Sequence, residues 1–248
     1  MSILIPENAH TWLDGNSASN QKHPDPTALK WPLSVSGTNE TISGVSSTGN
    51  IMVCKSLPHI AYAGPDKYKR VYRIDHRKHK PVLPQMSLHK GPEPSSPIWA
   101  KYEALGLSKA WVEIPCLCTG STIHGRVDVQ RKRDGRRNKY VFTMLLDGRE
   151  ETFGWRRSKN RMIKDLGLSQ NGYKLVRLTE TVPPTSSPTV PRASDRMEVV
   201  ALAGRSHHVL PRCMTAKFIK SFGQEWEVVA FTTLLAFWLW DRKHMMKG

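Results

Sequence analysis

Acidic residues are scarce in this sequence. The 248 residues include 21 Asp and Glu against 37 Lys and Arg, which gives a formal net charge of +16 at pH 7 and a pI near 9.9. A surplus of this size favours contact with polyanions such as nucleic acid or an anionic membrane face. Many basic chains have no nucleic-acid role, however, so the charge by itself does not choose a partner.

Cysteine is also rare, and the four cysteines form no metal-binding pattern. Cys116 and Cys118 have the wrong spacing for most zinc knuckles, and His207-His208 with Cys213 lacks the partners that would complete four ligands. The N-terminus has no basic start followed by an apolar run, so we expect no secretory signal and an intracellular protein. In that setting we expect all four cysteines to be free thiols, with no metal and no cofactor.

The usual catalytic motifs are missing. The sequence contains no nucleophile elbow, no Walker loop, no dinucleotide-binding glycine motif and no metalloprotease helix motif. Glu150-Glu151 is the one adjacent pair of glutamates, and consecutive residues of a strand point to opposite faces, so the pair is poorly arranged for acid–base work. These absences favour a binding protein over an enzyme.

Aliphatic residues are sparse in the first part of the chain. Residues 1–44 are rich in Ser, Asn, Pro, Thr and Gly, and such a stretch cannot bury enough apolar surface to offset the entropy of ordering it. We therefore expect a disordered N-terminal tail over residues 1–47 and one domain over residues 48–248. Trp12 and Trp31 could dock locally, but we expect deletion of residues 1–44 to leave the melting temperature nearly unchanged.

Beyond residue 50 the pattern is that of β-structure. Asp134-Gly135 and Asp147-Gly148 are typical two-residue hairpin turns, so the segments around them predict an antiparallel meander. Residues 158–167 are expected to hold one short helical turn. The segments with a strand-like pattern are 51–54, 70–75, 85–89, 110–115, 121–130, 139–146, 151–156, 173–178, 198–202 and 216–222.

The last apolar segment differs from the rest. No charged residue occurs from Val228 to Trp240, and a helix that is apolar on every side is either buried in a core or spans a membrane. A bilayer requires about 20 residues, so this segment is too short to cross one. We expect a buried helix over about residues 226–241 and no transmembrane segment. A buried strand, or a helix that faces a membrane or a partner, stays open as an alternative.

Only a structure that surrounds such a helix can bury it. A sheet closed into a barrel has an interior and no edges, so the sequence predicts a mainly β fold, an antiparallel closed barrel threaded by the C-terminal helix. Aromatic residues that alternate along the strands are expected in the core rather than as stacking platforms for bases. The expected core residues are Phe153, Trp155, Tyr173, Trp226, Phe231, Leu235 and Trp238.

Five pieces of the chain resemble a known superfamily in their order and spacing. They are residues 153–157, 172–178, 198–202, 216–223 and 225–230. They are similar to uncharacterised fungal proteins of the tubby C-terminal-like class, whose wider superfamily includes tubby proteins, LURP-one-related proteins and phospholipid scramblases. The resemblance covers about residues 48–245 and implies a roughly twelve-stranded antiparallel barrel around a central C-terminal helix.

The functions of that superfamily transfer less readily than its fold. Tubby proteins bind phosphoinositides through basic residues of a surface pocket, and no motif places those positions in this chain. Scramblases have an acidic calcium-associated segment and a palmitoylated cysteine cluster, and neither is visible here. The fungal members suggest a second hypothesis, which is an accessory protein or unrecognised enzyme of specialised metabolism.

The strongest local charge lies around the first hairpin turn. Between Arg126 and Lys164 there are 13 Lys or Arg and 5 Asp or Glu, a balance of +8. Phosphates of lipid headgroups or nucleic acid would suit this charge, although a solvated hairpin tip can also be basic simply to discourage edge pairing. A second basic run over residues 67–80 would widen the surface if its strand is a neighbour. The residues expected to project together as an anion-binding group are Arg131, Lys132, Arg133, Arg136 and Arg137.

These observations favour a non-enzymatic basic barrel module. Its expected partner is anionic membrane lipid, bound at the periphery, or another protein for which it serves as a scaffold. A nucleic-acid-associated protein held by phosphate contacts is a less favoured alternative. We expect a cytoplasmic location, at the inner membrane surface or in the nucleus.

Overall fold

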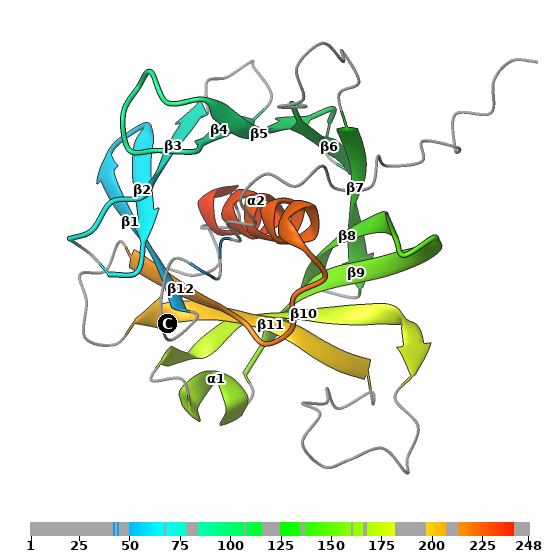
Figure 1. Cartoon of the computed structure of the whole chain (residues 1–248). Helices are drawn as coiled ribbons and strands as arrows, with labels where there is room; N and C mark the ends of the chain where they lie inside the picture. The colour runs from blue at the N-terminus through cyan, green and yellow to red at the C-terminus, as the bar shows by residue number, and fades with distance from the viewer. Residues whose placement is uncertain are drawn as a thin grey trace, which may run out of the picture. The chain divides into compact units, whose positions relative to one another are not determined.

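Figure 1 shows the fold as a computed structural model of the chain. It describes Ile42, Gly44 and residues 50–66, 68–77, 84–106, 108–115, 125–134, 137–159, 161–165, 168–181, 197–206 and 213–240. All of these belong to the unit Trp31–Gly248, and the other unit, Met1–Lys30, lies outside the described residues. The elements are β1 (Asn50–Leu57), β2 (Ile60–Gly64), β3 (Tyr72–Arg77), β4 (Gln85–His89), β5 (Ile98–Ala104), β6 (Lys109–Ile114), β7 (Gly125–Asp134), β8 (Arg137–Leu146), β9 (Arg149–Ser158), α1 (Arg161–Asp165), β10 (Leu168–Thr181), β11 (Met197–Ser206), β12 (Cys213–Phe218) and α2 (Gln224–Trp240).

The twelve strands form one closed antiparallel barrel. Strands β2 to β12 follow one another around the barrel in chain order, and β1 lies between β2 and β12. The barrel closes where β1 meets β12, over five residue pairs from Asn50–Lys217 to Cys54–Cys213. The predicted fold class is therefore confirmed.

Local sequence signals place several elements correctly. Strands β7, β8 and β9 form the predicted meander, and Asp147 and Gly148 both have positive φ angles, 50° and 78°, as a two-residue type I′ turn requires. Gly135 of the first turn lies outside the described residues. Strand β4 has the predicted bounds, and α1 lies within the segment expected to hold a helical turn.

The strands differ from the prediction in several places. Strands β2 and β5 have no counterpart among the predicted segments, because β2 is short and rich in small residues and β5 directly follows a proline-rich loop. The predicted strand 216–222 is wrong beyond Phe218. There the N–H groups of Ile219 and Lys220 both donate to the Val200 carbonyl, at 2.9 and 3.2 Å, and the chain turns away from the sheet toward α2.

Helix α2 passes through the interior of the barrel (Figure 1). Every side chain from Trp226 to Leu239 is buried, with at most 5% exposed, so the helix has no solvent-facing side. The predicted buried helix is thus confirmed, and the alternative of a buried strand is wrong. Glu225 and Glu227 lie in the first turn, where the positive end of the helix dipole favours carboxylates. Neither described helix is long and apolar enough to cross a bilayer.

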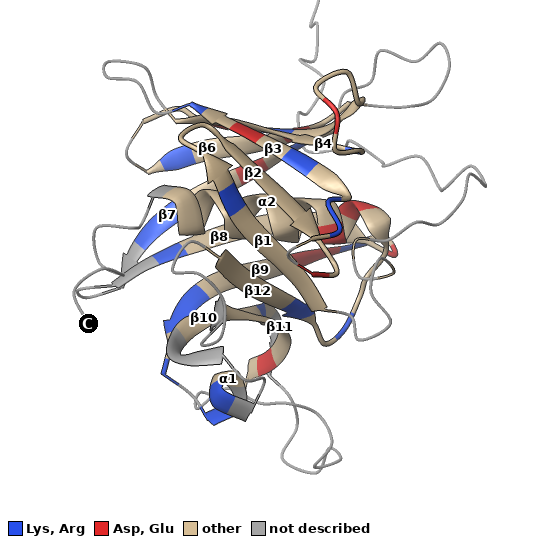
Figure 2. Cartoon of the chain, turned by 90° about the vertical axis from the view of Figure 1, so that its left-hand side faces the viewer, with Lys and Arg blue, Asp and Glu red and all other residues tan. Residues whose placement is uncertain are grey.

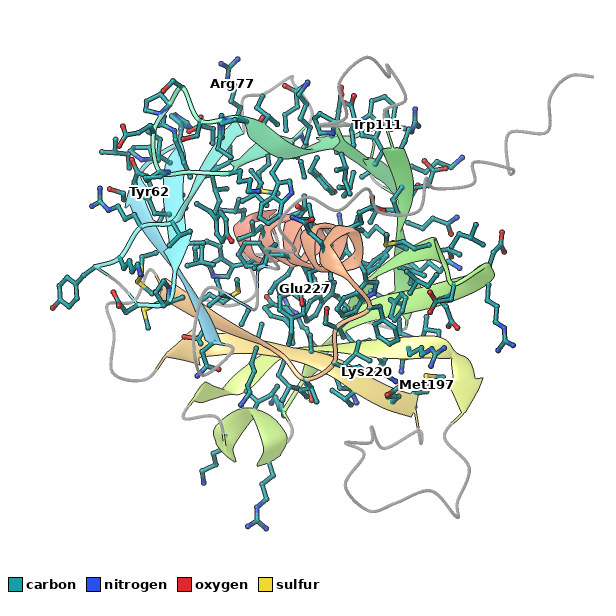
Figure 3. All side chains as sticks on the ribbon, in the orientation of Figure 1. Tyr62, Arg77, Trp111, Met197, Lys220 and Glu227 are labelled. Carbon is teal, nitrogen blue, oxygen red and sulfur yellow. A yellow bond between two sulfur atoms is a disulfide. The ribbon has the colours of Figure 1, made fainter. Side chains whose placement is uncertain are left out.

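Side chains fill the space between α2 and the strands (Figure 3). The Trp155 indole donates from Nε1 to the Ala230 carbonyl at 3.0 Å, which anchors β9 to the middle of the helix. The rings of Tyr140 and Tyr173 contact Phe237 at centroid distances of 4.6 and 4.5 Å. The structure buries all seven residues expected in the core: Phe153, Trp155, Tyr173, Trp226, Phe231, Leu235 and Trp238.

The segment expected to be a tail supplies one core residue. Ile42 is fully buried and belongs to the main hydrophobic cluster, together with the inward residues of the strands and α2. A single aliphatic residue in a polar stretch gives little sequence signal. Of the expected tail, residues 1–41, 43 and 45–47 lie outside the described residues, so the boundary after residue 47 stays a prediction.

The expectation of free thiols is wrong for two of the four cysteines. Cys54 of β1 and Cys213 of β12 are directly opposite in the closing strand pair and are joined by a disulfide, with their Cα atoms 4.3 Å apart. They are 159 residues apart in sequence, so only the barrel closure brings them together. Cys116 and Cys118 lie outside the described residues.

A second, smaller core lies on the outer side of the barrel. Ile163 of α1 is buried against Val176, Val199 and Leu202 of β10 and β11. Gly172 permits this approach, because a Cβ atom there would lie 2.3 Å from the Ala203 carbonyl oxygen and 2.9 Å from Ile163 Cγ2. Helix α1 is therefore fixed to the outside of β10 and β11.

Replacing Leu235 by Asp should unfold the barrel. Leu235 is fully buried in α2, and an unpaired buried charge costs several kcal/mol of a typical total stability of about 5–15 kcal/mol. Circular dichroism and thermal melting measure the effect. Leu235→Met is the control for side-chain volume, and Leu57→Asp places the same charge on a residue that is 55% exposed. An unchanged melting temperature for Leu235→Asp would contradict a buried helix.

The burial of Ile42 reverses the expected outcome of truncation. Deletion of residues 1–44 should cost about 2–5 kcal/mol, the usual range for loss of a buried aliphatic side chain. Deletion of residues 1–40 retains Ile42 and should cost much less. Thermal melting of the two truncated proteins and of full-length Ile42→Ala distinguishes the role of Ile42 from that of the preceding residues. Equal melting temperatures for the two truncations would remove Ile42 from the core.

Candidate functional site

Basic side chains form a row across the outer face of six neighbouring strands. Lys132 of β7 is directly opposite Lys139 of β8, and Arg156 of β9 is opposite Lys174 of β10. Between β8 and β9, Lys139 and Arg156 each lie next to a member of the Tyr140–Trp155 pair. Leu202 of β11 is opposite Lys174 of β10 on one side and opposite Lys217 of β12 on the other. Five of the six register positions are therefore basic. We call Lys132, Lys139, Arg156, Lys174 and Lys217 the basic row.

Strand alternation explains why the basic row points outward. Tyr140, Trp155, Tyr173 and Ala216 are core residues, and the neighbour of each core residue along a strand faces the opposite side. Exposure varies along the row, because Lys132 is exposed, Lys139, Arg156 and Lys217 are half-buried, and Lys174 is buried. Like charges at directly opposed positions repel, so an anion close to Lys132 and Lys139 would stabilise that pair.

Helix α1 and the residue Lys159 that precedes it add three more cations beside the row. Lys159, Arg161 and Lys164 are exposed, and α1 packs over Leu202, the apolar position between Lys174 and Lys217. Figure 2 shows Lys and Arg on β7, β10 and α1 and also on the upper strands, whereas Asp and Glu lie mainly at the upper strands and near the start of α2. The basic row together with Lys159, Arg161 and Lys164 is termed the basic face.

Two of the residues expected to bind an anion together are described in full. Lys132 faces outward in the basic row, whereas Arg131 is paired with the core residue Tyr140 in the register of β7 with β8. Consecutive strand residues point to opposite sides, but both side chains are exposed, so a shared anion-binding role stays a prediction. Arg133 and Arg137 lie in β7 and β8, but their side chains, like the whole of Arg136, are outside the described part of the chain.

Arg131 also lines a small cavity at one end of the barrel. The cavity measures about 70 Å³ and also has Tyr102, Lys109 and Tyr140 in its wall. Burial raises the pKa of the Tyr102 hydroxyl, with a further contribution from Tyr140, so Tyr102 stays protonated and can donate a hydrogen bond. The space suits one or a few waters or a small anion.

The second basic run does not widen the basic face. Its described part ends in β3, which lies between β2 and β4, away from β7 and β8 in the strand order. Figure 3 shows Arg77 of β3 and Trp111 of β6 on the outside of the barrel. Trp111 is covered by the Arg126 guanidinium, 3.6 Å from the ring centroid.

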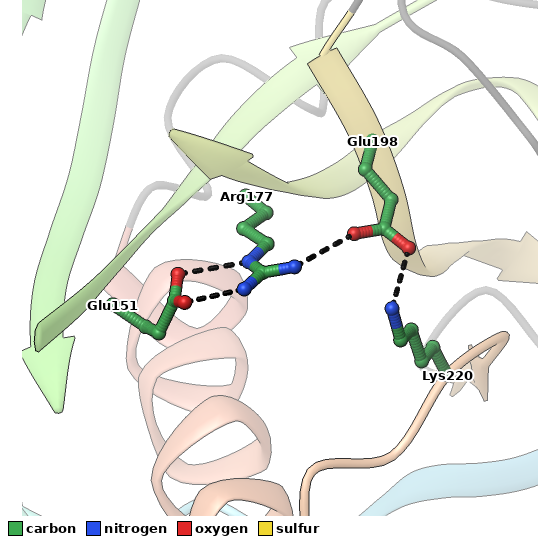
Figure 4. A network of polar contacts seen from close by, with 4 residues as sticks. All are labelled: Glu151, Arg177, Glu198 and Lys220. Atoms are coloured by element: carbon green, nitrogen blue, oxygen red, sulfur yellow. Dashed lines mark hydrogen bonds and ion pairs between the residues drawn. The ribbon is translucent and has the colours of Figure 1, made fainter. Parts of the chain in front are cut away.

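A charged network occupies the inner side of the barrel near the start of α2 (Figure 4). Arg177 of β10 donates from Nε to Glu151 Oε2 at 2.8 Å and from Nη2 to Glu151 Oε1. Its Nη1 lies 3.5 Å from Glu198 Oε2, and Lys220 Nζ donates to Glu198 Oε1 at 2.9 Å. Because both carboxylates pair with cations, the network is arranged for structure rather than for proton transfer.

Sequence reasoning missed this network, although a signal for it exists. Glu151 lies two residues before Phe153, and Arg177 lies two residues after Leu175, so both share the inward face with core residues. Glu150 is exposed, whereas Glu151 is buried, as expected for neighbours on a strand. Charged residues at inward positions of two adjacent strands could have predicted a pair.

A histidine holds one loop against the outer face. The Nε2 atom of His89 in β4 lies 3.2 Å from Asp75 Oδ2, and its Nδ1 atom lies 2.9 Å from the Ser96 carbonyl oxygen. Asp75 also accepts a hydrogen bond from Arg73 Nε. Within the described residues, no group of three His, Cys, Asp or Glu could hold a metal ion. Cys213 is in the disulfide, and His207-His208 lies outside the described residues.

Comparisons with known proteins name no relative. No protein-family model, no curated protein and no solved structure matches the chain. The resemblance to the tubby C-terminal-like class stays a prediction, and function must be inferred from the side chains themselves.

Removing the guanidinium of Arg177 should destabilise the barrel strongly. Arg177→Met leaves Glu151, whose side chain is only 7% exposed, without its bidentate partner, and loss of one member of a buried pair costs about 3–5 kcal/mol. Chemical denaturation measures the change in free energy of unfolding. The double variant Glu151→Met/Arg177→Met should recover much of the loss, and Arg149→Met, an exposed arginine of β9, is the control. A loss below about 1 kcal/mol for Arg177→Met would contradict a structural role for the pair.

Proposed function

We propose that this chain is a non-enzymatic barrel module that binds anionic membrane lipid through its basic face. The observation that carries the proposal is the basic row, in which five cations occupy register positions of neighbouring strands. Strands lie about 4.8 Å apart, so the four cations of the row that are not buried present closely spaced positive charge to headgroup phosphates. Each Lys or Arg near an anionic membrane surface contributes about 1 kcal/mol to binding.

Because the barrel wall is curved, the contact with a membrane is expected around α1. The basic row extends over β7 to β12, half of the twelve strands of a closed barrel, so a flat bilayer touches only part of it at a time. Helix α1 lies outside β10 and β11, and Figure 1 shows it projecting from the barrel wall. Its exposed Arg161 and Lys164, with the adjoining Lys159, would reach a planar surface first.

The occupied interior supports a binding role over catalysis. Helix α2 fills the barrel, and two cavities lined by described residues measure about 70 and 120 Å³. Pockets for small-molecule substrates usually measure about 300–1,000 Å³.

The positions of the aromatic residues favour lipid over nucleic acid. Single-stranded nucleic acid binds on exposed aromatic rings as well as on cations. Phe153, Trp155 and Tyr173 are all in the core, so they are not available for stacking. This argument favours lipid headgroups over single-stranded nucleic acid, and lipid binding agrees with the resemblance to the tubby-like superfamily and with a location at the cytoplasmic face of a membrane.

Vesicle sedimentation tests the basic face directly. The full-length protein should bind vesicles that contain anionic lipid, and the triple variant Lys159→Gln, Arg161→Gln, Lys164→Gln should bind roughly a hundredfold more weakly, at about 1 kcal/mol per charge. The matched control is Arg77→Gln, Lys101→Gln, Lys109→Gln, which removes the same charge from β3, β5 and β6. Circular dichroism verifies that both variants fold.

Each outcome of this test has a clear meaning. Loss confined to the basic-face variant supports the proposal. Equal loss in both variants would mean that net charge, and no particular face, drives binding. Binding to DNA or RNA but not to vesicles would favour the nucleic-acid alternative, and absence of binding to any polyanion at physiological salt would contradict the proposal.

A further inference from the structure

The disulfide lies at the position that closes the barrel. Cys54 and Cys213 form the last residue pair in the register of β1 with β12, on the outer face of both strands. The inward neighbours Val53 and Met214 are fully buried in the core. The covalent bond therefore ties the first strand of the barrel to its last one.

The two sulfur-bearing residues differ in access to solvent. Cys213 is only 5% exposed, whereas Cys54 is partly exposed and lines a cavity of about 120 Å³. Strands β1 and β2 and the following loop form this cavity. Its other lining residues are Lys55, Ser56, Tyr62, Ala63, Asp66, Lys69 and Arg70.

The cavity beside Cys54 carries a net positive charge. Three of its lining residues are cations and only Asp66 is an acid. Asp66 Oδ1 accepts hydrogen bonds from the backbone N–H groups of Tyr68 and Lys69, at 2.7 and 2.8 Å, and so holds the loop that presents the cations. The Arg70 guanidinium lies 4.5 Å from the Tyr62 ring centroid, which keeps it over the cavity wall.

We propose that this cavity is a thiol–disulfide exchange site for small anionic thiols. The incoming thiolate attacks Cys54 Sγ and forms a mixed disulfide, and Cys213 leaves as a thiolate that takes a proton from water. A second thiolate attacks the small-molecule sulfur of the mixed disulfide and releases Cys54 as a thiolate. Two small thiols are thus oxidised to one disulfide while the protein disulfide is reduced to two thiols. Lys69 and Arg70 attract the carboxylates of the incoming thiol.

Exchange at this site changes how firmly the barrel is closed. After reduction, β1 and β12 remain joined through the five residue pairs of their register, without a covalent bond. A disulfide that links residues 159 apart restricts the unfolded chain strongly, so its loss should lower the melting temperature by about 10 °C. The state of the thiol pool would thereby set the stability of the closed barrel.

Comparing thiols of different charge tests the site. The full-length protein is treated with glutathione, which is anionic, 2-mercaptoethanol, which is neutral, and cysteamine, which is cationic, at equal thiolate concentration. Alkylation and mass spectrometry follow the appearance of protein thiols. Glutathione should react about tenfold faster than cysteamine at low salt. The difference should nearly vanish at about 1 M salt, because the Debye length there is only about 3 Å and the attraction between charges is screened.

Two sets of variants assign the effect to the cavity. Lys69→Gln/Arg70→Gln should remove the preference for the anionic thiol, and Lys101→Gln/Lys109→Gln, with the same charge change on β5 and β6, should retain it. In Cys213→Ser, glutathione disulfide should place one glutathionyl group on Cys54. The fall in melting temperature with reductant should be absent from Cys54→Ser/Cys213→Ser.

Several results would overturn the proposal. Equal rates for the three thiols, or a preference that survives Lys69→Gln/Arg70→Gln, would show that the cavity does not select its reactant. Attachment of glutathione at Cys213 in Cys54→Ser but not at Cys54 in Cys213→Ser would reverse the assigned point of attack. Free Cys54 and Cys213 thiols that persist in excess glutathione disulfide would show that the bond does not form.

Discussion

The burial of one helix that is apolar on every side governs this structure. Helix α2 has no face that can meet water, so the strands must surround it completely. A closed barrel does this while leaving no strand edge unpaired, and the Trp155–Ala230 hydrogen bond fixes the helix against the wall. Glu151 and Arg177 bring charge into the interior as an ion pair near the start of the helix.

The same helix confines recognition to the outer surface. Because α2 fills the interior, a partner meets mainly the outward residues of the strands and α1. On five of the six strands β7 to β12 these residues include a cation of the basic row, although Lys132 and Lys217 are far apart in sequence. The basic row is therefore a product of register between strands, and an isolated hairpin would present only the part on β7 and β8.

Sequence patterns predicted the elements of this fold better than their lateral arrangement. The uncharged run after Val228 predicted the helix, and the Asp147-Gly148 turn predicted the hairpin, because both signals are local. The basic row, the Cys54–Cys213 disulfide and the burial of Ile42 all depend on which distant segments become neighbours. Local alternation could have separated Arg131 from Lys132, since it places successive strand residues on opposite faces.

The pairing of β1 with β12 has a consequence for biosynthesis. Strand β1 can pair with β2 at once, but it cannot pair with β12 until the segments between them have been synthesised, and α2, which completes the core, is made later still. Contacts between segments so distant in sequence form slowly, because the loop they close must lose its entropy first. The growing chain therefore exposes the inward residues of eleven strands with neither a closed wall nor a central helix to cover them. Closure of the barrel therefore waits for the synthesis of β12 and α2, and chaperones that shield apolar strands would have their role in that interval.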